Sequence, residues 1–312
     1  MTNHWAVMVM GAGLALGSTA GAAPVETVIN VPGFVDFLAV DGDKIWATNM
    51  GRVERWSRAG KIAEVPLAGA CGAMTISAGS LWVADCKAKT VNRIDIRAAR
   101  VTAVIATGLA SPDGEMNVVS GAGSVWVASD QTGVVARINP ATNTIIASVK
   151  VEPGSCYLAF GEGALWVVSA ASQTLQKVDP AVNSVIKTTR LGKAPGFLTA
   201  GVGGVWVQEQ GDGTVVRIEP ATGDITGRVK VDETLKYGDI DTGGGQVWLR
   251  TTSGQTYVVI DPVSLAIRAR VGSPSGSGAL RYTDAGVWTS AHDKHILSWW
   301  AEPAAGAMQD SR

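Results

Sequence analysis

Residues 203–207 have the sequence Gly-Gly-Val-Trp-Val, and this short stretch recurs with its surroundings along most of the chain. Its tryptophan is found at Trp46, Trp82, Trp126, Trp166, Trp206, Trp248 and Trp288. The spacings between successive tryptophans are 36, 44, 40, 40, 42 and 40 residues. Internal repeats of about 40–45 residues with several short strands are typical of propeller blades.

Two apolar positions in every copy predict a pair of strands that includes the tryptophan. The residue before the tryptophan is always aliphatic: Ile45, Leu81, Val125, Leu165, Val205, Val247 and Val287. The residue eight positions before it is always apolar: Leu38, Met74, Val118, Leu158, Leu198, Ile240 and Leu280. Between them, five copies carry a glycine suited to the positive φ of a tight hairpin turn, namely Gly79, Gly123, Gly163, Gly203 and Gly245.

The second half of each copy predicts two more strands joined by a turn. Thr214–Ile218 represents the third strand and Asn143–Val149 the fourth. Several third strands end in Asn-Pro, Asp-Pro or Glu-Pro, where proline presets φ for a turn. The pattern predicts an all-β fold, a seven-bladed β-propeller of four-stranded antiparallel blades. The tryptophan is a large apolar ring at one fixed place, so we expect it to wedge between neighbouring blades.

The two ends of the repeat region predict how the ring closes. The last copy has strands near residues 279–283, 287–290 and 296–300 and lacks a fourth one. Val25–Val31 resembles a spare fourth strand ahead of the first copy. We therefore expect this N-terminal strand to pair with Ile296–Trp300 of the last blade, because pairing removes both open sheet edges.

The N-terminus predicts an exported protein. Trp5–Gly17 is apolar, of signal-peptide length and too short to span a membrane, and Ala20–Ala22 is a small-x-small cleavage site. We expect residues 1–22 to be a signal peptide, residues 23–302 the propeller and residues 303–312 a disordered tail. The mature protein is then periplasmic or secreted, with no membrane span after cleavage; the alternative is an uncleaved anchor.

Charge and composition restrict the partners. The formal net charge is −1, and the sequence has no basic patch and no interleaving of basic with aromatic residues. Nucleic acid is therefore not an expected partner. We expect a single closed ring that is a monomer and presents its loops to a small molecule, a peptide or a protein.

The three cysteines suit an oxidising compartment. Cys71 precedes the second copy's tryptophan hairpin and Cys86 follows Trp82 by four residues. Both are expected on one face of the same blade, which makes a Cys71–Cys86 disulfide plausible. Cys156 is left over, and we interpret it as a small apolar residue near the ring axis rather than a nucleophile.

Positions that vary from copy to copy, while the tryptophan stays constant, mark a candidate site because packing does not fix them. They lie eleven and nine residues before the tryptophan and three after it. The topology places them on the face that carries the loops before each first strand, here called the top face. The predicted ligand-binding residues are Phe37, Asn49, Asp85, Tyr157, Phe197 and Tyr237. The alternative is that they only solvate the channel mouth.

Three carboxylates are candidates for catalysis. Glu115, Asp239 and Glu209 come from the third, sixth and fifth copies and would form a cluster for acid–base work or for Mg²⁺ or Ca²⁺. His292 is a further candidate metal ligand beside Glu209 and Asp239. The alternative is that His292 and His295, three residues apart in one loop, are simply solvated.

Two segments, Val215–Ile225 and Ala136–Ile145, resemble the YVTN group of β-propeller repeats. The Gly-x-x-Trp-Val element also resembles that of streptogramin (virginiamycin B) lyases, whose blades carry Leu-Trp-Phe-Thr-Glu. That resemblance implies a metal-dependent elimination that opens a cyclic depsipeptide with Mg²⁺ and a histidine base. Glu209 matches the final acid of the lyase element and Asp85 is close to it.

The histidines of those lyases lie where blades begin. The matching places in this chain are Pro195–Phe197 and Tyr237–Asp239, neither of which contains histidine. Many YVTN-type propellers resemble exported binding or scaffold proteins, which need no catalytic base.

Three functions are therefore weighed. The first is an exported binding or interaction module with its site at the top face of the channel. The second is a lyase-like enzyme with a metal and channel-face carboxylates, which needs a base and metal ligands within about 3 Å of one point. The third is a periplasmic subunit that docks a redox partner, which needs an apolar patch of more than a few hundred Å².

Overall fold

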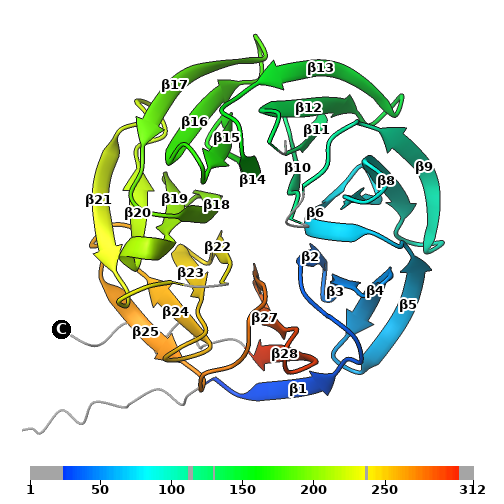
Figure 1. Ribbon diagram of the computed structural model, residues 1–312. Coiled ribbons are helices and arrows are strands. Elements are labelled where there is room, and N and C mark those ends of the chain that lie inside the picture. Colours follow the sequence, from blue (N-terminus) through cyan, green and yellow to red (C-terminus); the bar gives the residue numbers. More distant parts are fainter. Residues whose placement is uncertain (1–23, 112–114, 129–130, 236–237, 302–312) are drawn as a thin grey trace, which may run out of the picture.

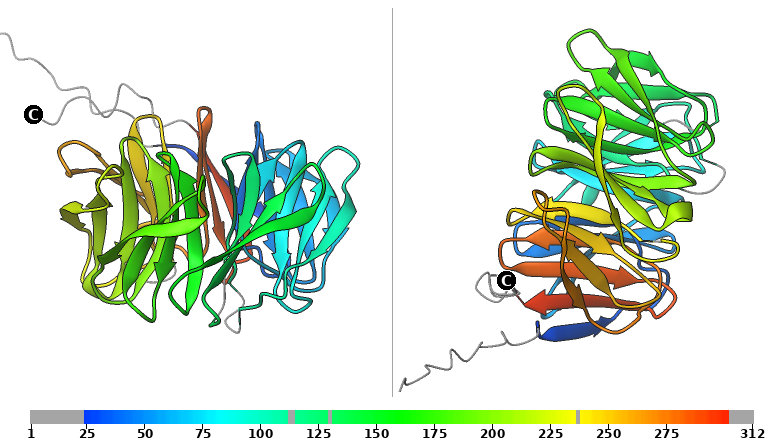
Figure 2. Two further views of the ribbon diagram at one scale, coloured as in Figure 1. Left: turned by 90° about the horizontal axis from the view of Figure 1, so that it is seen from above. Right: turned by 90° about the vertical axis from the view of Figure 1, so that its left-hand side faces the viewer.

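The computed structural model describes residues 24–111, 115–128, 131–235 and 238–301. They form seven four-stranded antiparallel sheets arranged as blades around a central channel (Figure 1). Figure 2 shows the ring edge-on, with the strands running between its two faces. The predicted seven-bladed, all-β propeller is confirmed. The predicted signal peptide at residues 1–22 and tail at residues 303–312 lie outside the described residues.

The first strand of each blade lines the channel and the second carries the tryptophan. The first strands are β2 (Leu38–Asp41), β6 (Ala70–Ser77), β10 (Val118–Gly121), β14 (Ser155–Gly161), β18 (Pro195–Gly201), β22 (Ile240–Gly243) and β26 (Leu280–Thr283). The second strands are β3 (Lys44–Asn49), β7 (Ser80–Asp85), β11 (Ser124–Val127), β15 (Ala164–Ser169), β19 (Gly204–Glu209), β23 (Gln246–Arg250) and β27 (Gly286–Ala291).

The third and fourth strands build the outer part of each blade. The third strands are β4 (Arg52–Ser57), β8 (Thr90–Asp95), β12 (Val134–Asn139), β16 (Thr174–Asp179), β20 (Thr214–Ile218), β24 (Tyr257–Ile260) and β28 (Ile296–Ala301). The outermost strands are β5 (Gly60–Pro66), β9 (Arg100–Ala106), β13 (Thr144–Lys150), β17 (Ser184–Arg190), β21 (Ile225–Lys230), β25 (Ile267–Val271) and β1 (Glu26–Asn30). Among the described residues, helical structure is limited to the 3-10 turn η1 (Gln210–Asp212), and no helix is long and apolar enough to cross a membrane.

The hairpin between the first two strands of a blade has the positive φ values that the glycines predict. In blade 5, Val202 and Gly203 have φ of +48° and +69°. Two successive positive φ values are the signature of a type I′ turn, whose twist matches that of the flanking strands. The same pair of positive values recurs at Ala78 and Gly79 in blade 2, so the repeat fixes this turn as well as the strands.

Each repeat tryptophan is buried in the interface with the next blade. Trp206 of blade 5 packs with Val247, Leu249 and Ile260 of blade 6. Trp288 of blade 7 packs with Ile45 of blade 1, so the same contact also closes the ring. The expectation that the tryptophans are wedges between blades agrees with this packing, because each large ring fills the space between two twisted sheets.

The N-terminal strand completes the last blade as predicted. In that sheet the strand order is β1-β28-β27-β26, and Glu26 pairs with Trp300 while Asn30 pairs with Ile296. The backbone N–H of Val31 then donates to the carbonyl of His295 at 2.8 Å. The first and last strands of the propeller therefore belong to one sheet, and the ring has no break between its ends.

The predicted Cys71–Cys86 pair is a disulfide in blade 2, with its Cα atoms 5.9 Å apart. Cys71 lies in β6 and Cys86 directly follows β7, so the bridge joins the start of the first strand to the end of the second. The closed loop is short, and a loop of this length contributes about 3 kcal/mol in the chain-entropy account. Cys156 lies in β14, half-buried rather than fully buried.

Removal of the closing strand should destabilise the whole ring. We compare a chain that begins at Pro32 with a control chain that begins at Pro24 and keeps β1. The shorter chain should melt about 10 °C or more below the control, because it reopens the edge of β28 and uncovers the cluster into which Val31 packs. Each kcal/mol is worth about 2–4 °C in a domain of 150–250 residues. Circular dichroism melts measure the difference, and equal melting temperatures would refute closure by β1.

Candidate functional site

A cavity of about 580 Å³ opens at the top face of the channel. Its lining comes from the first strands and the loops before them and from the loops after the second strands, and it draws on six of the seven blades. Four carboxylate residues line it: Asp36, Glu115, Asp239 and Asp293. Its aromatic lining consists of Phe34, Phe37, Tyr157 and Phe197, together with the imidazole of His292. We call it the top-face cavity.

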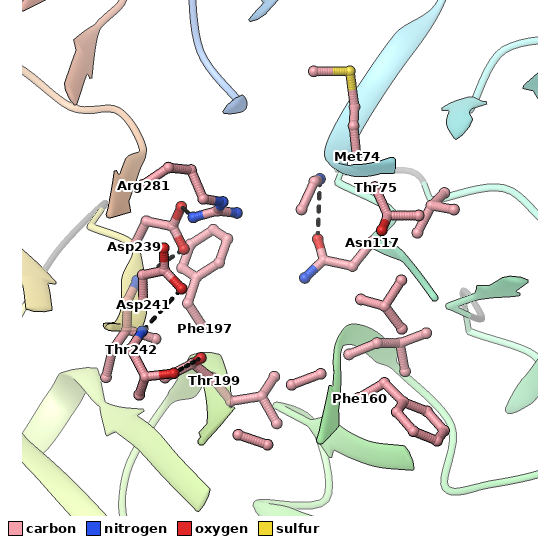
Figure 3. A pocket seen from close by; sticks show the side chains of 18 of the residues that line it. Met74, Thr75, Asn117, Phe160, Phe197, Thr199, Asp239, Asp241, Thr242 and Arg281 are labelled. Carbon is pink, nitrogen blue, oxygen red and sulfur yellow. Dashed lines mark hydrogen bonds and ion pairs between the residues drawn. The ribbon is translucent and has the colours of Figure 1, made fainter. Parts of the chain in front are cut away.

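A second cavity of about 280 Å³ lies in the channel between the first strands. Figure 3 shows Asp239, Asp241 and Arg281 on one side of this channel cavity and Asn117 on the other. Phe197 and Asp239 line both cavities, so they stand at the boundary between the two.

The boundary is an aromatic layer. The rings of Phe37 and Phe197 lie 6.3 Å apart, and those of Tyr157 and Phe197 lie 4.7 Å apart. Phe37 and Phe197 are buried within the largest apolar cluster of the molecule. These three predicted ligand-binding residues therefore form an apolar surface at the inner end of the top-face cavity, while the acidic groups surround it.

Asp36 has the most perturbed environment in the top-face cavity. Protein atoms surround most of its carboxylate, and this loss of water raises the pKa of Asp36 to about 7. The negative charges of Glu115, Asp239 and Asp293 raise it further. Asp36 is therefore partly protonated at neutral pH, in contrast to an exposed aspartate.

Two of the acids that were predicted as catalytic, Glu115 and Asp239, line this cavity and have partners. The Tyr157 hydroxyl donates to Glu115 Oε2 at 2.7 Å. Arg281 donates to Asp239 and forms an ion pair with it (Figure 3). Burial raises the pKa of Asp241, while the same guanidinium and the backbone N–H of Tyr282 act against that rise. Arg281 thus balances two buried carboxylates of the channel.

His292 lies at the rim of the top-face cavity. Its ring stacks on Phe34 with centroids 4.0 Å apart and an interplanar angle of 22°. Burial lowers the pKa of His292, so the imidazole is neutral at pH 7. Its Nδ1 is buried and accepts or donates no hydrogen bond among the described residues. A neutral imidazole beside carboxylates can accept a proton from a bound molecule.

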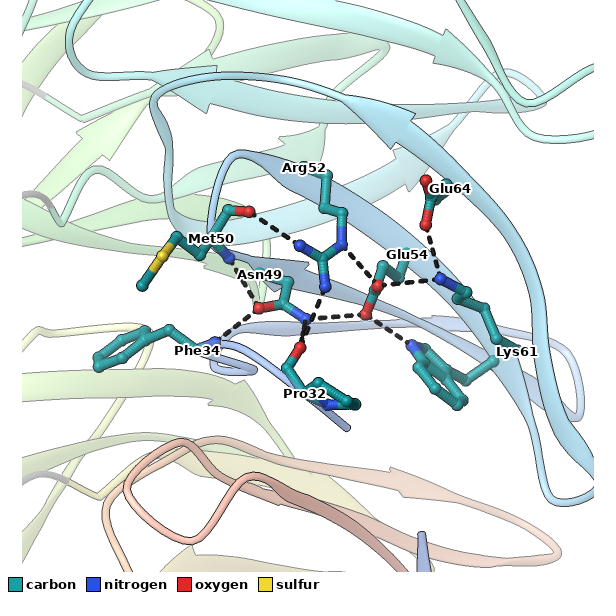
Figure 4. A network of polar contacts seen from close by, with 9 residues as sticks. Pro32, Phe34, Asn49, Met50, Arg52, Glu54, Lys61 and Glu64 are labelled. Carbon is teal, nitrogen blue, oxygen red and sulfur yellow. Dashed lines mark hydrogen bonds and ion pairs between the residues drawn. The ribbon is translucent and has the colours of Figure 1, made fainter. Parts of the chain in front are cut away.

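The residues three positions after the tryptophan serve a different purpose from the one expected. Figure 4 shows Asn49 between the N-terminal segment and blade 1. Its Oδ1 accepts from the Phe34 N–H at 2.6 Å, and its Nδ2 donates to Glu54 at 2.9 Å. In blade 2, Asp85 accepts from the Ala88 N–H at 2.8 Å. Both side chains fix loops of their own blade.

Glu209 makes the same kind of contact in blade 5. Its carboxylate accepts from the Gly192 N–H at 2.8 Å and the Thr214 hydroxyl at 2.7 Å, and it forms an ion pair with Arg228 at 2.9 Å. Despite burial, these donors hold the pKa of Glu209 below its usual value. Glu209 is 1% exposed and lines neither cavity.

The structure thus brings together six of the predicted site residues around the top-face cavity: Phe37, Glu115, Tyr157, Phe197, Asp239 and His292. It places Asn49, Asp85 and Glu209 away from that cavity, contrary to the expected single funnel, because their side chains bind loop backbone. Tyr237 lies outside the described residues. In the described ranges no three His, Cys, Asp or Glu side chains form a group that could hold a metal ion.

Sequence reasoning missed Asp36 and Phe34. Asp36 stands ten residues before Trp46, between the two positions that were compared across the copies, Val35 and Phe37. A comparison that included this intermediate position would have found an isolated acid in the first copy. Phe34 stands twelve residues before Trp46, one position beyond those compared, where the other copies have Ala70, Gly114, Gly154, Ala194, Lys236 and Gly276.

Solved structures with the same fold include virginiamycin B lyase from Staphylococcus aureus, at a TM-score of 0.77 and 16% identity over 89% of this chain and 99% of that one. A catalytically inactive histidine-to-alanine variant of that lyase with quinupristin matches at 0.75 and 15%, over 89% and 99% of the two chains. Kuenenia stuttgartiensis hydrazine synthase matches at 0.69 and 13%, over 93% and 99%.

No family model and no curated relative matches the sequence. At these identities the likeness to the lyases and to hydrazine synthase concerns the fold, which is shared with chains of different chemistry. The function must be argued from the residues of the top-face cavity.

Glu209 should contribute to stability in a pH-dependent way. Its pKa is below 4.5 in the folded state, so its contribution is present above that pH and is lost as pH falls through the folded-state pKa. We expect Glu209→Gln to cost about 1–3 kcal/mol at pH 7 and much less at pH 3. Urea denaturation measures this, with exposed Glu233→Gln as the control, expected within 0.5 kcal/mol of wild type. A pH-independent difference would contradict the assignment.

Proposed function

We propose that this protein is an exported binding module whose top-face cavity takes a small molecule or a segment of a peptide. The observation that carries the proposal is the convergence of carboxylates and aromatic rings from six blades on one cavity of about 580 Å³. Ligand pockets are usually concave, of about 300–1,000 Å³, mostly apolar and set with a few polar groups. The top-face cavity has each of these properties.

Export is part of this proposal. The apolar stretch Trp5–Gly17 and the small-x-small site at Ala20–Ala22 support a signal peptide. The Cys71–Cys86 disulfide supports an oxidising compartment, since such bridges persist outside the cytosol. The periplasm or the medium is therefore the place where we expect the ligand to be met.

Docking of a redox partner has less support in the described residues. Large exposed apolar side chains are spread over the outer strands of several blades, as with Ile62 in β5, Val104 in β9 and Ile186 in β17. These three lie outside the top-face cavity, whereas Phe34 is a large exposed apolar residue that lines it.

A cavity-filling variant tests the binding proposal. A fragment screen by ligand-detected NMR should give hits with the wild-type protein that are lost in Ser277→Phe, because Ser277 lines the cavity and a phenyl ring there takes up its volume. Ser253→Phe is the matched control, since Ser253 is exposed and lies outside the cavity. Hits that bind Ser277→Phe and Ser253→Phe equally would place the ligand site elsewhere.

A lyase-like enzyme is the second candidate, and His292 is the observation that favours it. Its neutral imidazole faces a cavity with carboxylates, and the similar lyase loses activity when a histidine becomes alanine. A base in this position could take a proton from a substrate α to a carbonyl, and such general-base catalysis contributes about 10²–10⁴-fold to rate.

Turnover of quinupristin tests the second candidate. The protein is incubated with quinupristin and Mg²⁺, and mass spectrometry follows the opened ring. A lyase should lose at least about 100-fold in rate in His292→Gln. His295→Gln is the control, because His295 is outside the cavity and contacts the carbonyl of Gly33. Absence of turnover in the wild type, or equal loss in both variants, would remove His292 as the base.

A further inference from the structure

We infer that the top-face cavity binds an organic cation, whose ammonium or guanidinium group lies beside Asp36 and whose apolar body packs on Phe37, Tyr157 and Phe197. This inference rests on the proposed binding function and adds the chemical class of the ligand. Two independent features carry it: the Asp36 carboxylate, which has no hydrogen bond or ion pair among the described residues, and the aromatic surface of the cavity.

Among the described residues, acidic side chains outnumber basic ones in the lining of the cavity. Its described lining contains four carboxylates and no lysine or arginine side chain. Of the four acids, Asp239 has an ion pair, with Arg281, which reaches it from the channel side. Glu115 accepts from the uncharged hydroxyl of Tyr157. Among the described residues Asp36 and Asp293 have no ion pair, so a ligand that brings one positive charge would meet negative charge beside these two acids.

Asp36 is the acid whose charge is least stabilised. No hydrogen bond or ion pair joins its carboxylate to another described residue, although its backbone N–H donates to Thr48 O at 3.1 Å and its carbonyl accepts from the Ser290 hydroxyl at 2.5 Å. The backbone of Asp36 is thus held in place, while the carboxylate lines the cavity. A charge in such surroundings is unfavourable unless a counter-charge arrives.

The charged groups around Asp36 affect how readily its carboxyl group ionises. Glu115, Asp239 and Asp293 disfavour its ionised form. Two described cations lie near the other acids of this region, and neither reaches the Asp36 carboxylate with a hydrogen bond or ion pair. Arg281 pairs with Asp239, and buried Arg250 donates to backbone carbonyls, among them Thr256 O at 2.9 Å and Ser290 O at 3.1 Å. His292, neutral at pH 7, adds no positive charge there.

The aromatic surface selects an organic cation over a bare metal ion. Phe37, Tyr157 and Phe197 present ring atoms to the cavity instead of oxygen ligands. Aromatic faces attract cations, by roughly 0.5–2 kcal/mol for a well-placed pair, and they bury apolar carbon atoms. The cavity volume of about 580 Å³ also suits a molecule of drug-like size.

Binding of a cation beside Asp36 has a measurable consequence. The pKa of Asp36 is about 7, so at pH 7 about half of the protein molecules carry a proton there. A cation favours the ionised carboxylate, and binding should release about half a proton per ligand. The affinity should rise by up to about tenfold between pH 6 and pH 8 as Asp36 ionises.

Three probes of matched shape test the ligand class by calorimetry: phenethylamine, 2-phenylethanol and 3-phenylpropionate. They are a cation, a neutral molecule and an anion with the same phenyl group and similar length. The expected result is that phenethylamine binds the wild-type protein at least tenfold more tightly than 2-phenylethanol, and that 3-phenylpropionate binds least. Titrations in buffers of different ionisation enthalpy measure the released proton.

Two charge-neutralising variants locate the effect. Asp36→Asn should lose the preference for the amine and the proton release while 2-phenylethanol binds as before. Asp43→Asn removes the same charge from the exposed turn between β2 and β3 and should behave as wild type. Asp36→Asn should also fold: the raised pKa destabilises the native state as pH rises from about 4 to 7, and the variant lacks that penalty.

Several outcomes would overturn the inference. These are an equal affinity for the three probes, no binding of phenethylamine at 10 mM, an amine preference that survives in Asp36→Asn, or a Mg²⁺ affinity that exceeds that of the amine. In each case fragment binding that is lost in Ser277→Phe would still support the top-face cavity as the binding site, so the two proposals can fail separately.

Discussion

In blades 2, 3 and 4 the repeat tryptophan is fixed by a hydrogen bond within its blade and by a cation that reaches the next blade; these rings are Trp82, Trp126 and Trp166. The Trp126 N–H donates to Gly121 O at 3.1 Å, and the Arg137 guanidinium lies over the ring, 4.6 Å from its centroid. Arg137 also donates to Pro180 O and to Asn183, in the turn between the outer strands of the next blade. One ring and one guanidinium therefore hold two blades at a set angle, and Arg93 repeats the contact one blade earlier.

The contact between the tryptophan ring and its cation does not involve the residues that line the channel, so those residues can take other roles. The wedges and their cations lie toward the middle and outer strands, whereas the top-face cavity is lined by the loops around the channel. Loop clamps such as Glu209 hold these loops from within each blade. The acids and aromatic rings of the cavity can thus differ from blade to blade without disturbing the ring, which explains why one fold serves unrelated functions.

The same division explains how far the sequence could predict the structure. A tryptophan that recurs every 36–44 residues indicates packing that is repeated in every blade. The strands, the closing pair Val25–Val31 with Ile296–Trp300 and the Cys71–Cys86 bridge could therefore be predicted. Variation between the copies at one position shows only that packing does not fix the residue there. Asn49 and Glu209 vary because several polar groups can hold a loop, whereas Phe37 and Asp239 vary because they face the cavity, and only the folded ring separates the two cases.

Asp36 destabilises the folded protein at neutral pH, and this destabilisation is the argument for a role in binding. A carboxylate that is enclosed, without a counter-charge and close to three other acids works against folding at neutral pH, and an asparagine of nearly the same shape would avoid that cost. Polar groups held in unfavourable surroundings are common where a protein binds or reacts, because a partner relieves them. A bound cation offsets this destabilisation because it favours the ionised carboxylate. Asp36 thereby couples occupancy of the cavity to proton release.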